Sequence, residues 1–356
     1  MPQAAQQVPS RFRELTRQQL SYIPQQQMNV FGNTYTFGLG NTGYVANIYL
    51  MLSGTVTIPA TPTGSWQTYP PLPYSLIRRL RIYTSENVEL LNLSGWGLMF
   101  FLLRQKRLST PPVDPIPYLN AAGRAALLTV PSGALVAGAI PISGWFKVPI
   151  MTDDATMLGL LLIQTLDIRC YLEITMASAS DLVTTGATLP SACAINVTPT
   201  VEFFSIPPGA NQPNLAWVHT ITEEIFPLTT TGDIIYRPPI GNVYMSLSGI
   251  IENNGAQLPP ANINQVSLAY AQSVRPYYEP YLNHLARNKW NYGLTMPDGA
   301  FSFDFSLGSG DPGSDEPRDF LNSSQQTDLQ ILINATGFTP VNGQIRVIRE
   351  QLASIG

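Results

Sequence analysis

The residues of this chain that could perform chemistry are few and lie far apart in the sequence. Residues 38–43 read GLGNTG, which matches the G-x-G-x-x-G pattern of dinucleotide-binding turns. That pattern holds a pyrophosphate only where a helix follows the turn, and it needs an acidic residue about 20 positions further on. Here residues 44–49 have the pattern of a strand, and residues 58–66 contain no Asp or Glu. We therefore expect a turn between two strands.

Histidines and cysteines, the usual metal ligands and nucleophiles, number two each. Cys170 and Cys193 are too few for a disulfide framework or a four-cysteine zinc site. Two histidines leave little room for a multi-histidine metal centre, and no G-x-S-x-G nucleophile turn occurs. His219 lies in an alternating pattern that predicts a strand, and His284 is expected on the solvated face of a helix. The sequence therefore predicts no cofactor, and no metal site built on these residues.

Carboxylates gather in one segment, where glycines and prolines separate Asp311, Asp315, Glu316 and Asp319. Their spacing does not match the alternating oxygen ligands and closing glutamate of an EF-hand loop. We favour a solvated loop that begins a helix, with a cation site as the alternative. A glycosidase pair of carboxylates stays open, because the separation that it needs is spatial and no pair stands out in the sequence.

The composition is that of a weakly charged chain. Of its 356 residues, 44% are hydrophobic and 12% are charged, against about 25% charged in typical soluble domains. The 19 basic and 23 acidic residues give a net charge of −4, which excludes a general electrostatic surface for nucleic acid. A compact basic run, residues 104–107, is typical of a solvated strand end or of a contact with an acidic neighbour in an assembly. Such a composition favours a protein that is packed against copies of itself.

Residues 1–32 are rich in glutamine and basic side chains and differ from the rest of the chain. They lack the apolar core of a secretory signal, and the most apolar runs, residues 98–103 and 157–163, are far shorter than the ~20 residues of a membrane span. We therefore expect a soluble chain with free thiols. We also expect an N-terminal arm in which Ser10 caps a short helix. Its candidate contact residues, on a flexible arm or on a basic tether for a partner or an anionic membrane, are Arg11, Phe12, Arg13, Leu15 and Arg17.

From residue 33 onward the pattern is that of an all-β protein. Alternation of apolar and polar residues, clearest at 79–82 and 170–176, predicts strands with one buried face. Further strands, separated by turn residues as in a sandwich or barrel, are expected at residues 44–58, 96–103, 144–150, 201–206, 217–226, 243–251, 265–274, 300–307, 328–335 and 344–352. Helices are expected at residues 153–163 and 279–292, the second ended by Gly293.

An internal repeat divides the chain. Residues 47–54 (NIYLMLSG) recur as residues 242–249 (NVYMSLSG), with five of the eight positions identical. In both halves the octapeptide is followed by further strands, an acidic segment that begins a helix, another strand and a final strand. We therefore predict two tandem copies of one β-sandwich, residues 33–206 and 207–356, with a boundary at the Pro-Pro-Gly of residues 207–209.

The order of these elements resembles that of the double jelly-roll major capsid proteins of tailless, membrane-containing icosahedral DNA viruses, most closely those of tectivirus-like bacteriophages. The resemblance is carried by residues 80–83 (LRIY), which lead through a turn to residues 94–96 (SGW), and by residues 144–149 (GWFKVP) ahead of an acidic segment. In the second half it is carried by the expected helix 279–292 ahead of the strand 300–307. Departures are expected in the loop 104–138.

The resemblance implies an all-β fold of two tandem eight-stranded jelly-roll β-sandwiches with a few short helices and an N-terminal arm, residues 1–32. Three chains would form a pseudo-hexagonal homotrimer, the capsomer of an icosahedral virion, beside minor capsid and vertex proteins. The arm would reach an internal viral membrane, and the chain would pass from the host cytoplasm into the virion. No enzyme activity, no cofactor and no sequence-specific contact with nucleic acid are implied. Few core positions lie in the arm, so we expect a chain without it to form trimers but to assemble poorly around lipid.

Two other functions stay open. A jelly-roll carbohydrate- or receptor-binding module of a virion would need a concave aromatic groove, for which Tyr277, Tyr278 and Tyr281 are candidates. For these tyrosines we favour a packed junction between a strand and a helix. A glycoside hydrolase on a β-sandwich would need a pair of carboxylates that the sequence does not identify.

Overall fold

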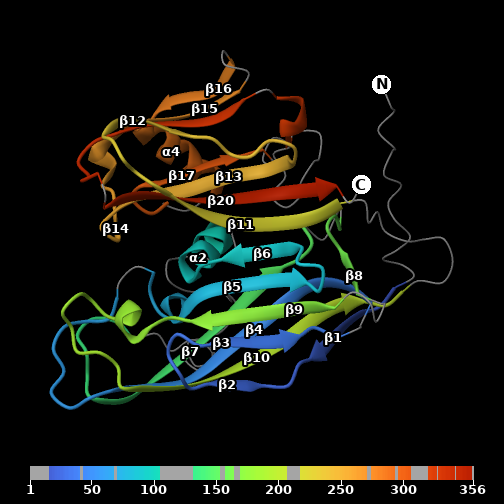
Figure 1. Cartoon of the computed structure of the whole chain (residues 1–356), viewed down its shortest axis with the longest axis vertical. Coiled ribbons are helices and arrows are strands. Elements are labelled where there is room, and N and C mark those ends of the chain that lie inside the picture. Colours follow the sequence, from blue (N-terminus) through green and yellow to red (C-terminus); the bar gives the residue numbers. More distant parts are fainter. Residues whose placement is uncertain are drawn as a thin grey trace.

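The structure of the chain is a computed structural model. It describes residues 16–40, 43–67, 70–104, 131–152, 157–163, 169–206, 217–270, 274–292, 296–305, 320–326, 328–340 and 342–354. These residues form two β-sandwiches stacked along the long axis of the molecule, and the helix α2 (Gly95–Arg104) lies between them (Figure 1).

The first sandwich consists of two antiparallel sheets. One sheet has the order β1-β10-β4-β7, with the short strands β2 and β8 paired to β10 and β4, and the other has the order β3-β9-β5-β6. The bounds are β1 (Gln18–Tyr22), β2 (Gln26–Met28), β3 (Thr34–Gly38), β4 (Gly43–Ile58), β5 (Ile77–Thr84), β6 (Glu89–Leu93), β7 (Gly138–Pro149), β8 (Leu161–Ile163), β9 (Cys170–Met176) and β10 (Ala192–Phe204).

The second sandwich repeats this arrangement with the sheets β11-β20-β13-β17 and β12-β19-β15-β16, and the short strands β14 and β18 pair with β13. The bounds are β11 (Trp217–Pro227), β12 (Gly232–Tyr236), β13 (Val243–Asn253), β14 (Ala256–Gln257), β15 (Ile263–Tyr270), β16 (Val274–Pro280), β17 (Ala300–Asp304), β18 (Leu321–Asn322), β19 (Leu329–Ala335) and β20 (Gly343–Ser354). With the eight principal strands counted in chain order, both sandwiches have the sheets 1-8-3-6 and 2-7-4-5. This is the jelly-roll arrangement, so the predicted fold class is confirmed.

Each sandwich has its own apolar core. In β9 the buried residues Cys170, Leu172, Ile174 and Met176 alternate with half-buried ones, as the sequence pattern predicted. The second core is rich in aromatic side chains, because Phe301 and its neighbours in β17 are fully buried. Two separate cores of this kind are what two tandem copies of one sandwich require.

The octapeptide repeat occupies the same strand in both sandwiches, since residues 47–54 lie in β4 and residues 243–249 in β13. Its final glycine is required by a close approach of two backbones. A Cβ atom on Gly54 would lie 1.9 Å from the carbonyl oxygen of Ala194, and one on Gly249 would lie 2.3 Å from that of Arg346. Both carbonyls belong to the last strand of their sandwich, so the repeat records one packing solution used twice.

Two predicted elements differ from the structure, and a third differs only at its start. Residues 96–103, predicted as a strand, lie in the helix α2, whose residues are all buried, so that no polar face reveals its period. The predicted helix 153–163 ends instead in the strand β8, and residues 153–156 lie outside the described residues. The second predicted helix is confirmed as α4 (Tyr281–Tyr292), although Glu279 and Pro280 belong to β16.

The N-terminal segment is in part a component of the first sandwich. β1 and β2 both pair with β10, and Met28 is fully buried. Loss of residues 1–32 would remove both strands, so we expect it to destabilise the first sandwich. Arg17 lies just before β1, and its backbone N–H donates to Ser205 Oγ at 3.0 Å. Ser10 and the other candidate contact residues, Arg11, Phe12, Arg13 and Leu15, lie outside the described residues.

Two further expectations concern local structure and the membrane. β3 ends at Gly38 and β4 begins at Gly43, so the glycine-rich segment separates two strands and is not followed by a helix. Among the described residues, no helix is both long and apolar enough to span a bilayer.

Candidate functional site

The junction between the sandwiches brings together side chains from both halves of the chain. β6 of the first sandwich and β11 of the second pair in parallel, with Leu91 opposite Ile221 and Asn92 opposite Thr222. The pairing joins one sheet from each sandwich into a continuous ten-stranded sheet, and α2 lies beside it (Figure 1). The two sandwiches are therefore joined by backbone hydrogen bonds, by the helix α2 and by the side chains described below.

The start of α2 is fixed by a carboxylate from the second sandwich. Ser94 is its N-cap, and Ser94 Oγ accepts the backbone N–H of Gly97 at 3.1 Å. Glu223 on β11 accepts the backbone N–H of Ser94 at 2.6 Å and its hydroxyl at 3.0 Å. A negative charge at this end of a helix is favourable, because the helix dipole is positive there. Gly97 is needed because a Cβ atom would lie 2.4 Å from Glu223 Oε2.

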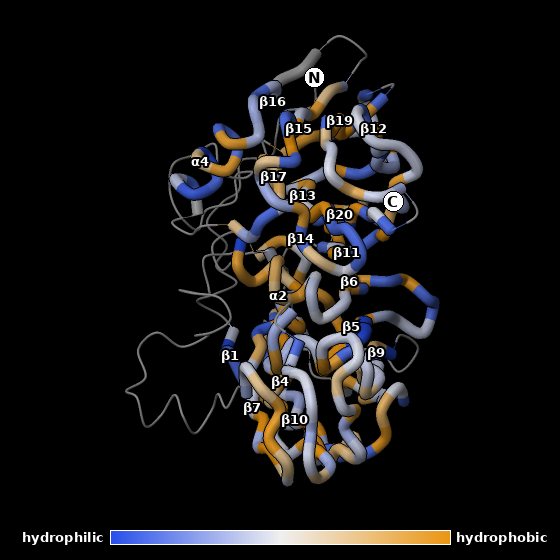
Figure 2. Tube along the Cα trace, turned by 90° about the vertical axis from the view of Figure 1, so that its left-hand side faces the viewer, coloured by the Kyte–Doolittle hydropathy of each residue, from blue (hydrophilic) through white to orange (hydrophobic). Residues whose placement is uncertain are grey.

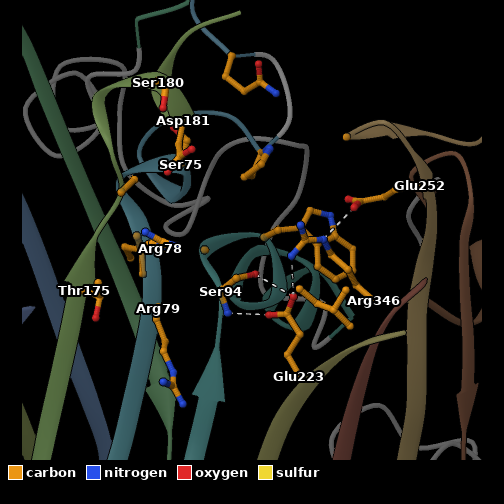
Figure 3. A pocket seen from close by; sticks show the side chains of 18 of the residues that line it. Ser75, Arg78, Arg79, Ser94, Thr175, Ser180, Asp181, Glu223, Glu252 and Arg346 are labelled. Atoms are coloured by element: carbon orange, nitrogen blue, oxygen red, sulfur yellow. Dashed lines mark hydrogen bonds and ion pairs between the residues drawn. The ribbon is translucent and has the colours of Figure 1, made fainter. Parts of the chain in front are cut away.

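Arg346 on β20 continues this network across the second sandwich. Its guanidinium contacts Glu223 Oε1 at 3.2 Å and Glu252 Oε2 at 2.8 Å. Burial opposes the charge, but the two carboxylates outweigh it and raise the pKa of Arg346 above its ordinary value. Figure 3 shows Glu223 between Ser94 and Arg346, with Glu252 on the far side of Arg346. Both carboxylates are thus committed to holding the junction together.

A second ion cluster lies at the other end of α2. Arg104, 5% exposed, contacts Glu350 Oε2 at 3.1 Å and Asp304 Oδ2 at 3.5 Å, and it donates to Ser248 Oγ at 3.0 Å. His219 donates from Nδ1 to the carbonyl of Ile150 at 3.0 Å, and its Nε2 lies 3.2 Å from Glu350 Oε1. Arg104 and Ile150 belong to the first sandwich, so the cluster links the two sandwiches.

The charge state of Glu350 follows from these contacts. Burial disfavours its ionised form, but the hydrogen bond from His219 and the charge of Arg104 outweigh burial and lower its pKa from 4.5 to about 2. The two ring nitrogens of His219 lie against the carbonyl oxygen of Ile150 and the carboxylate of Glu350. The cluster links the two sandwiches through the attraction between oppositely charged buried groups, and Glu350 is committed to these contacts.

A groove of about 950 Å³ opens between the sandwiches beside this network. Its walls include Ser75, Arg78 and Asp181 from the first sandwich, and Glu223, Glu252 and Arg346 from the second (Figure 3). Asp181 accepts the backbone N–H of Ser178 at 3.0 Å and caps its own turn. Since Glu223 and Glu252 share Arg346, the groove shows no carboxylate pair arranged as acid and nucleophile.

The Glu279–His284 contact resembles a catalytic dyad but has a structural role. His284 Nδ1 donates to Glu279 Oε1 at 2.9 Å, while Nε2 accepts the backbone N–H of Ser302 at 3.0 Å. A general base would need that nitrogen free for substrate. His284 is fully buried, so the solvated position expected from the sequence is wrong. This burial is the main reason why the pKa of His284 is lowered. The strand position predicted for His219, in β11, is confirmed.

The three candidate tyrosines do not form a groove. Tyr281 is fully buried, and its hydroxyl donates to the carbonyl of Ala300 at 2.9 Å. Tyr277 packs against Phe303, with ring centroids 5.5 Å apart, whereas Tyr278 is 61% exposed. Tyr277 and Tyr281 lie in the packed junction between β16 and α4 that the sequence analysis favoured, whereas Tyr278 does not.

The thiols and the acidic segment supply no reactive centre among the described residues. Cys170 and Cys193 are unpaired and buried, and burial raises the pKa of Cys170 to about 12, far from the thiolate form that reacts. No group of three His, Cys, Asp or Glu residues in the described ranges could hold a metal ion. The acidic residues between 311 and 319 lie outside those ranges.

Sequence reasoning missed the two ion clusters. Arg104 was assigned to a solvated strand end, yet it is buried and meets acidic partners. The alternative of an acidic neighbour was correct in kind, but the neighbour lies in the same chain. Glu350 is one of several polar residues in β20, so its charge gave no distinct signal, and 246 positions separate it from Arg104. Only the fold could pair them.

Comparison with known proteins shows which solved structures have this arrangement of strands. No family model matches the chain, and no curated protein matches its sequence. The major capsid protein of Sulfolobus turreted icosahedral virus matches in structure with a TM-score of 0.67, at 12% identity over 95% of this chain and 97% of that chain. VP54 of PBCV-1, fitted into a reconstruction of the virophage Sputnik, gives 0.66 at 11% identity over 95% and 93%. The major capsid protein P2 from bacteriophage PM2 gives 0.56 at 12% identity over 96% and 98%.

These solved structures are double jelly-roll major capsid proteins. This chain has their fold, along nearly its whole length. At identities of 11–12% the likeness establishes the fold and leaves the function to be argued from the chain itself.

Proposed function

We propose that the chain is a major capsid protein whose homotrimers form the pseudo-hexagonal capsomers of an icosahedral virion. The observation that carries the proposal is that both sandwiches have the same strand order and stand side by side in one subunit. Three such chains present six similar sandwiches around a ring, which is an outline suited to tiling. The structural likeness to major capsid proteins over the full length of both chains supports the same role.

The chemistry of the described residues also supports a structural role. The buried histidine and the groove carboxylates described above are committed to internal contacts. A chain with 12% charged residues suits large permanent interfaces, which are more apolar than the rest of a protein surface. We accordingly infer no enzyme activity and no cofactor.

The finer parts of the proposal concern position in the particle. We assign the domains as an arm (1–32), a first jelly roll (33–206) and a second (207–356), with β1 and β2 of the arm segment built into the first sheet. The partners would be further copies of the chain, minor capsid and vertex proteins, and an internal viral membrane of a bacteriophage. The membrane contact would use the basic and apolar residues Arg11, Phe12, Arg13, Leu15 and Arg17. The chain would be made in the host cytoplasm and reside in the virion.

Native mass measurement of the purified protein tests the capsomer. We expect a species of three times the mass of the 356-residue chain at micromolar concentration, with a hexagonal outline in electron micrographs. A stable monomer under these conditions would contradict the proposal.

Truncation tests the arm. Removal of residues 1–15, which leaves β1 intact, should preserve trimers and weaken binding to anionic vesicles. Removal of residues 1–32 is the control for strand loss, because it also takes β1 and β2 from the sheet and should lower thermal stability. Equal vesicle binding by the full chain and the 1–15 deletion would refute the membrane contact.

A further inference from the structure

The junction inside the chain is a template for a junction between chains. Because the strand order repeats, each sandwich has one side formed by its fifth strand and the following helix, and another side formed by its first and last strands. Inside the chain, β6 and α2 of the first sandwich meet β11 and β20 of the second. The matching sides are β16 with α4 in the second sandwich and β1 with β10 in the first. Among the described residues, β16 and β1 are edge strands of their sheets.

We propose that these two sides bind each other between two copies of the chain. The inference rests on the proposed function and names the surfaces by which the subunits of the capsomer join. In it, the α4 face of one copy packs on the outer face of the sheet β1-β10-β4-β7 of the next. The α4 face consists of Leu282, Ala286 and Trp290. On the outer sheet face the contact residues are Leu20, Tyr22, Met51 and Trp145, which share this face with Thr198, Lys147 and Glu202.

The two helices are equivalent elements with different surroundings. Each begins within two residues of the end of the fifth strand, so alignment of their first residues places Arg104 of α2 opposite Trp290 of α4. Arg104 is buried at the junction inside the chain, whereas Trp290 is 89% exposed and Leu282 is 66% exposed. Figure 2 shows α4 projecting from one side of the second sandwich. A tryptophan so exposed, one turn apart from other apolar residues, indicates a face that a partner covers.

The two sheets can be aligned residue by residue through the glycines of the repeat. Gly249 is opposite Val347 on β20 and Gly54 is opposite Ile195 on β10, so Glu350 corresponds to Thr198. Ser246, opposite Glu350, corresponds to Met51, which is opposite Thr198.

The same alignment places the flanking strands. Asp304 lies opposite Ser246, and Trp145 lies opposite Met51, so Asp304 corresponds to Trp145. His219 corresponds to Tyr22, because each of them pairs with the equivalent residue of the last strand in its own sandwich.

The chemistry of the two junctions changes together on both sides. Inside the chain a charged helix residue, Arg104, meets carboxylates on the sheet. At the matching side the helix residue is Trp290, and the sheet has Met51 in the place of Ser246, Trp145 in the place of Asp304 and Thr198 in the place of Glu350. The neighbouring Tyr22 is 75% exposed, in the position where His219 is covered inside the chain. The exposed apolar side chains of α4 are thus matched by apolar side chains at the corresponding places of the sheet, and each set replaces members of a buried ion cluster.

Introduction of a negative charge at single exposed positions tests the interface. We expect Trp290→Glu and Tyr22→Glu each to weaken trimer formation, measured by sedimentation, by at least about 30-fold per junction, which equals about 2 kcal/mol. Leu282→Glu should act in the same direction. Leu189→Glu is the matched control, because Leu189 is 52% exposed but lies on neither surface, and it should leave the trimer intact. Thermal melting of each monomer verifies that the fold survives.

A proximity measurement gives a positive result that does not depend on destabilisation. A chain with Trp290→Cys and Met51→Cys, treated with a short bis-maleimide, should form covalent dimers and trimers, while each single variant should not. Leu189→Cys with Met51→Cys is the control pair and should remain monomeric on a denaturing gel. The native thiols are buried and react poorly.

The outcomes separate this inference from the proposed function. A wild-type chain that is monomeric overturns both. A wild-type trimer that persists in Trp290→Glu and Tyr22→Glu, with no cross-link between positions 290 and 51, overturns the assignment of these surfaces and leaves the capsomer standing. Loss of the trimer in those variants, together with the cross-link, supports the assignment.

Discussion

Replacement of Arg104 by methionine should destabilise the chain strongly although it removes no core residue. The variant leaves Glu350 buried without its cation, and removal of one partner from a buried ion pair costs about 3–5 kcal/mol. The pKa of Glu350 points in the same direction, because His219 and Arg104 outweigh the burial that disfavours its charge and lower the pKa. We therefore expect a loss of about 3 kcal/mol, the lower end of the range for a broken buried ion pair.

Thermal unfolding followed by circular dichroism measures this loss. With an unfolding entropy of about 2.1 cal/mol/K per residue over 356 residues, about 3 kcal/mol corresponds to a drop of about 4 °C in Tm. Arg79→Met is the matched control, because the Arg79 side chain is 46% exposed and its ion pair with Glu89 is worth at most about 1 kcal/mol. Adding Glu350→Gln to Arg104→Met should recover part of the loss, because the uncompensated charge is then gone. If Arg104→Met and Arg79→Met have equal Tm values, Arg104 does not hold the junction.

Three more outcomes are expected. Thermal stability should fall as the pH drops below 6.5, because the folded state resists protonation of His284. It should fall further between pH 4.5 and 2, where Glu350 loses a charge that the folded state stabilises. A Tm that stays flat from pH 6.5 to 3 would be inconsistent with both effects. Gly97→Ala should lower stability by about 1–3 kcal/mol in denaturant unfolding although alanine favours helices, because its Cβ displaces Glu223 from the start of α2; an unchanged midpoint would show that Glu223 moves freely. Cys170 should resist iodoacetamide at pH 8 in the folded chain and react after unfolding, as mass spectrometry would show; rapid labelling of the folded chain would contradict its burial.

Local pattern predicted the sandwiches well where one strand face is buried and the other is wet. The alternation in β9 and the octapeptide shared by β4 and β13 both have direct structural causes, one in burial and one in the close approach at the glycines. The pattern failed for α2, because a helix covered by two sandwiches is apolar all round and cannot be told from a buried strand. It also misplaced His284, whose polar neighbours in sequence gave no sign that it turns inward to Ser302.

The candidate site was harder to predict than the fold. Arg104, His219 and Glu350 come from three distant parts of the chain and are brought together by the fold. A charged residue at the end of an apolar run has the same sequence pattern whether its partner is water or a buried carboxylate. The burial of Arg104 was therefore beyond local reasoning, while the presence of an acidic partner could be imagined but not located.

The parallel pairing of β6 with β11 has a mechanical consequence. Because one sheet runs unbroken across the boundary and buried ion pairs hold it beside α2, rotation of one half against the other would break backbone hydrogen bonds. It would also leave buried charges without their partners. The two sandwiches therefore behave as one rigid body with a fixed angle between them. If such chains form the capsomers proposed above, a shell would bend where separate capsomers meet, and one shape of the chain would serve both flat facets and bent edges.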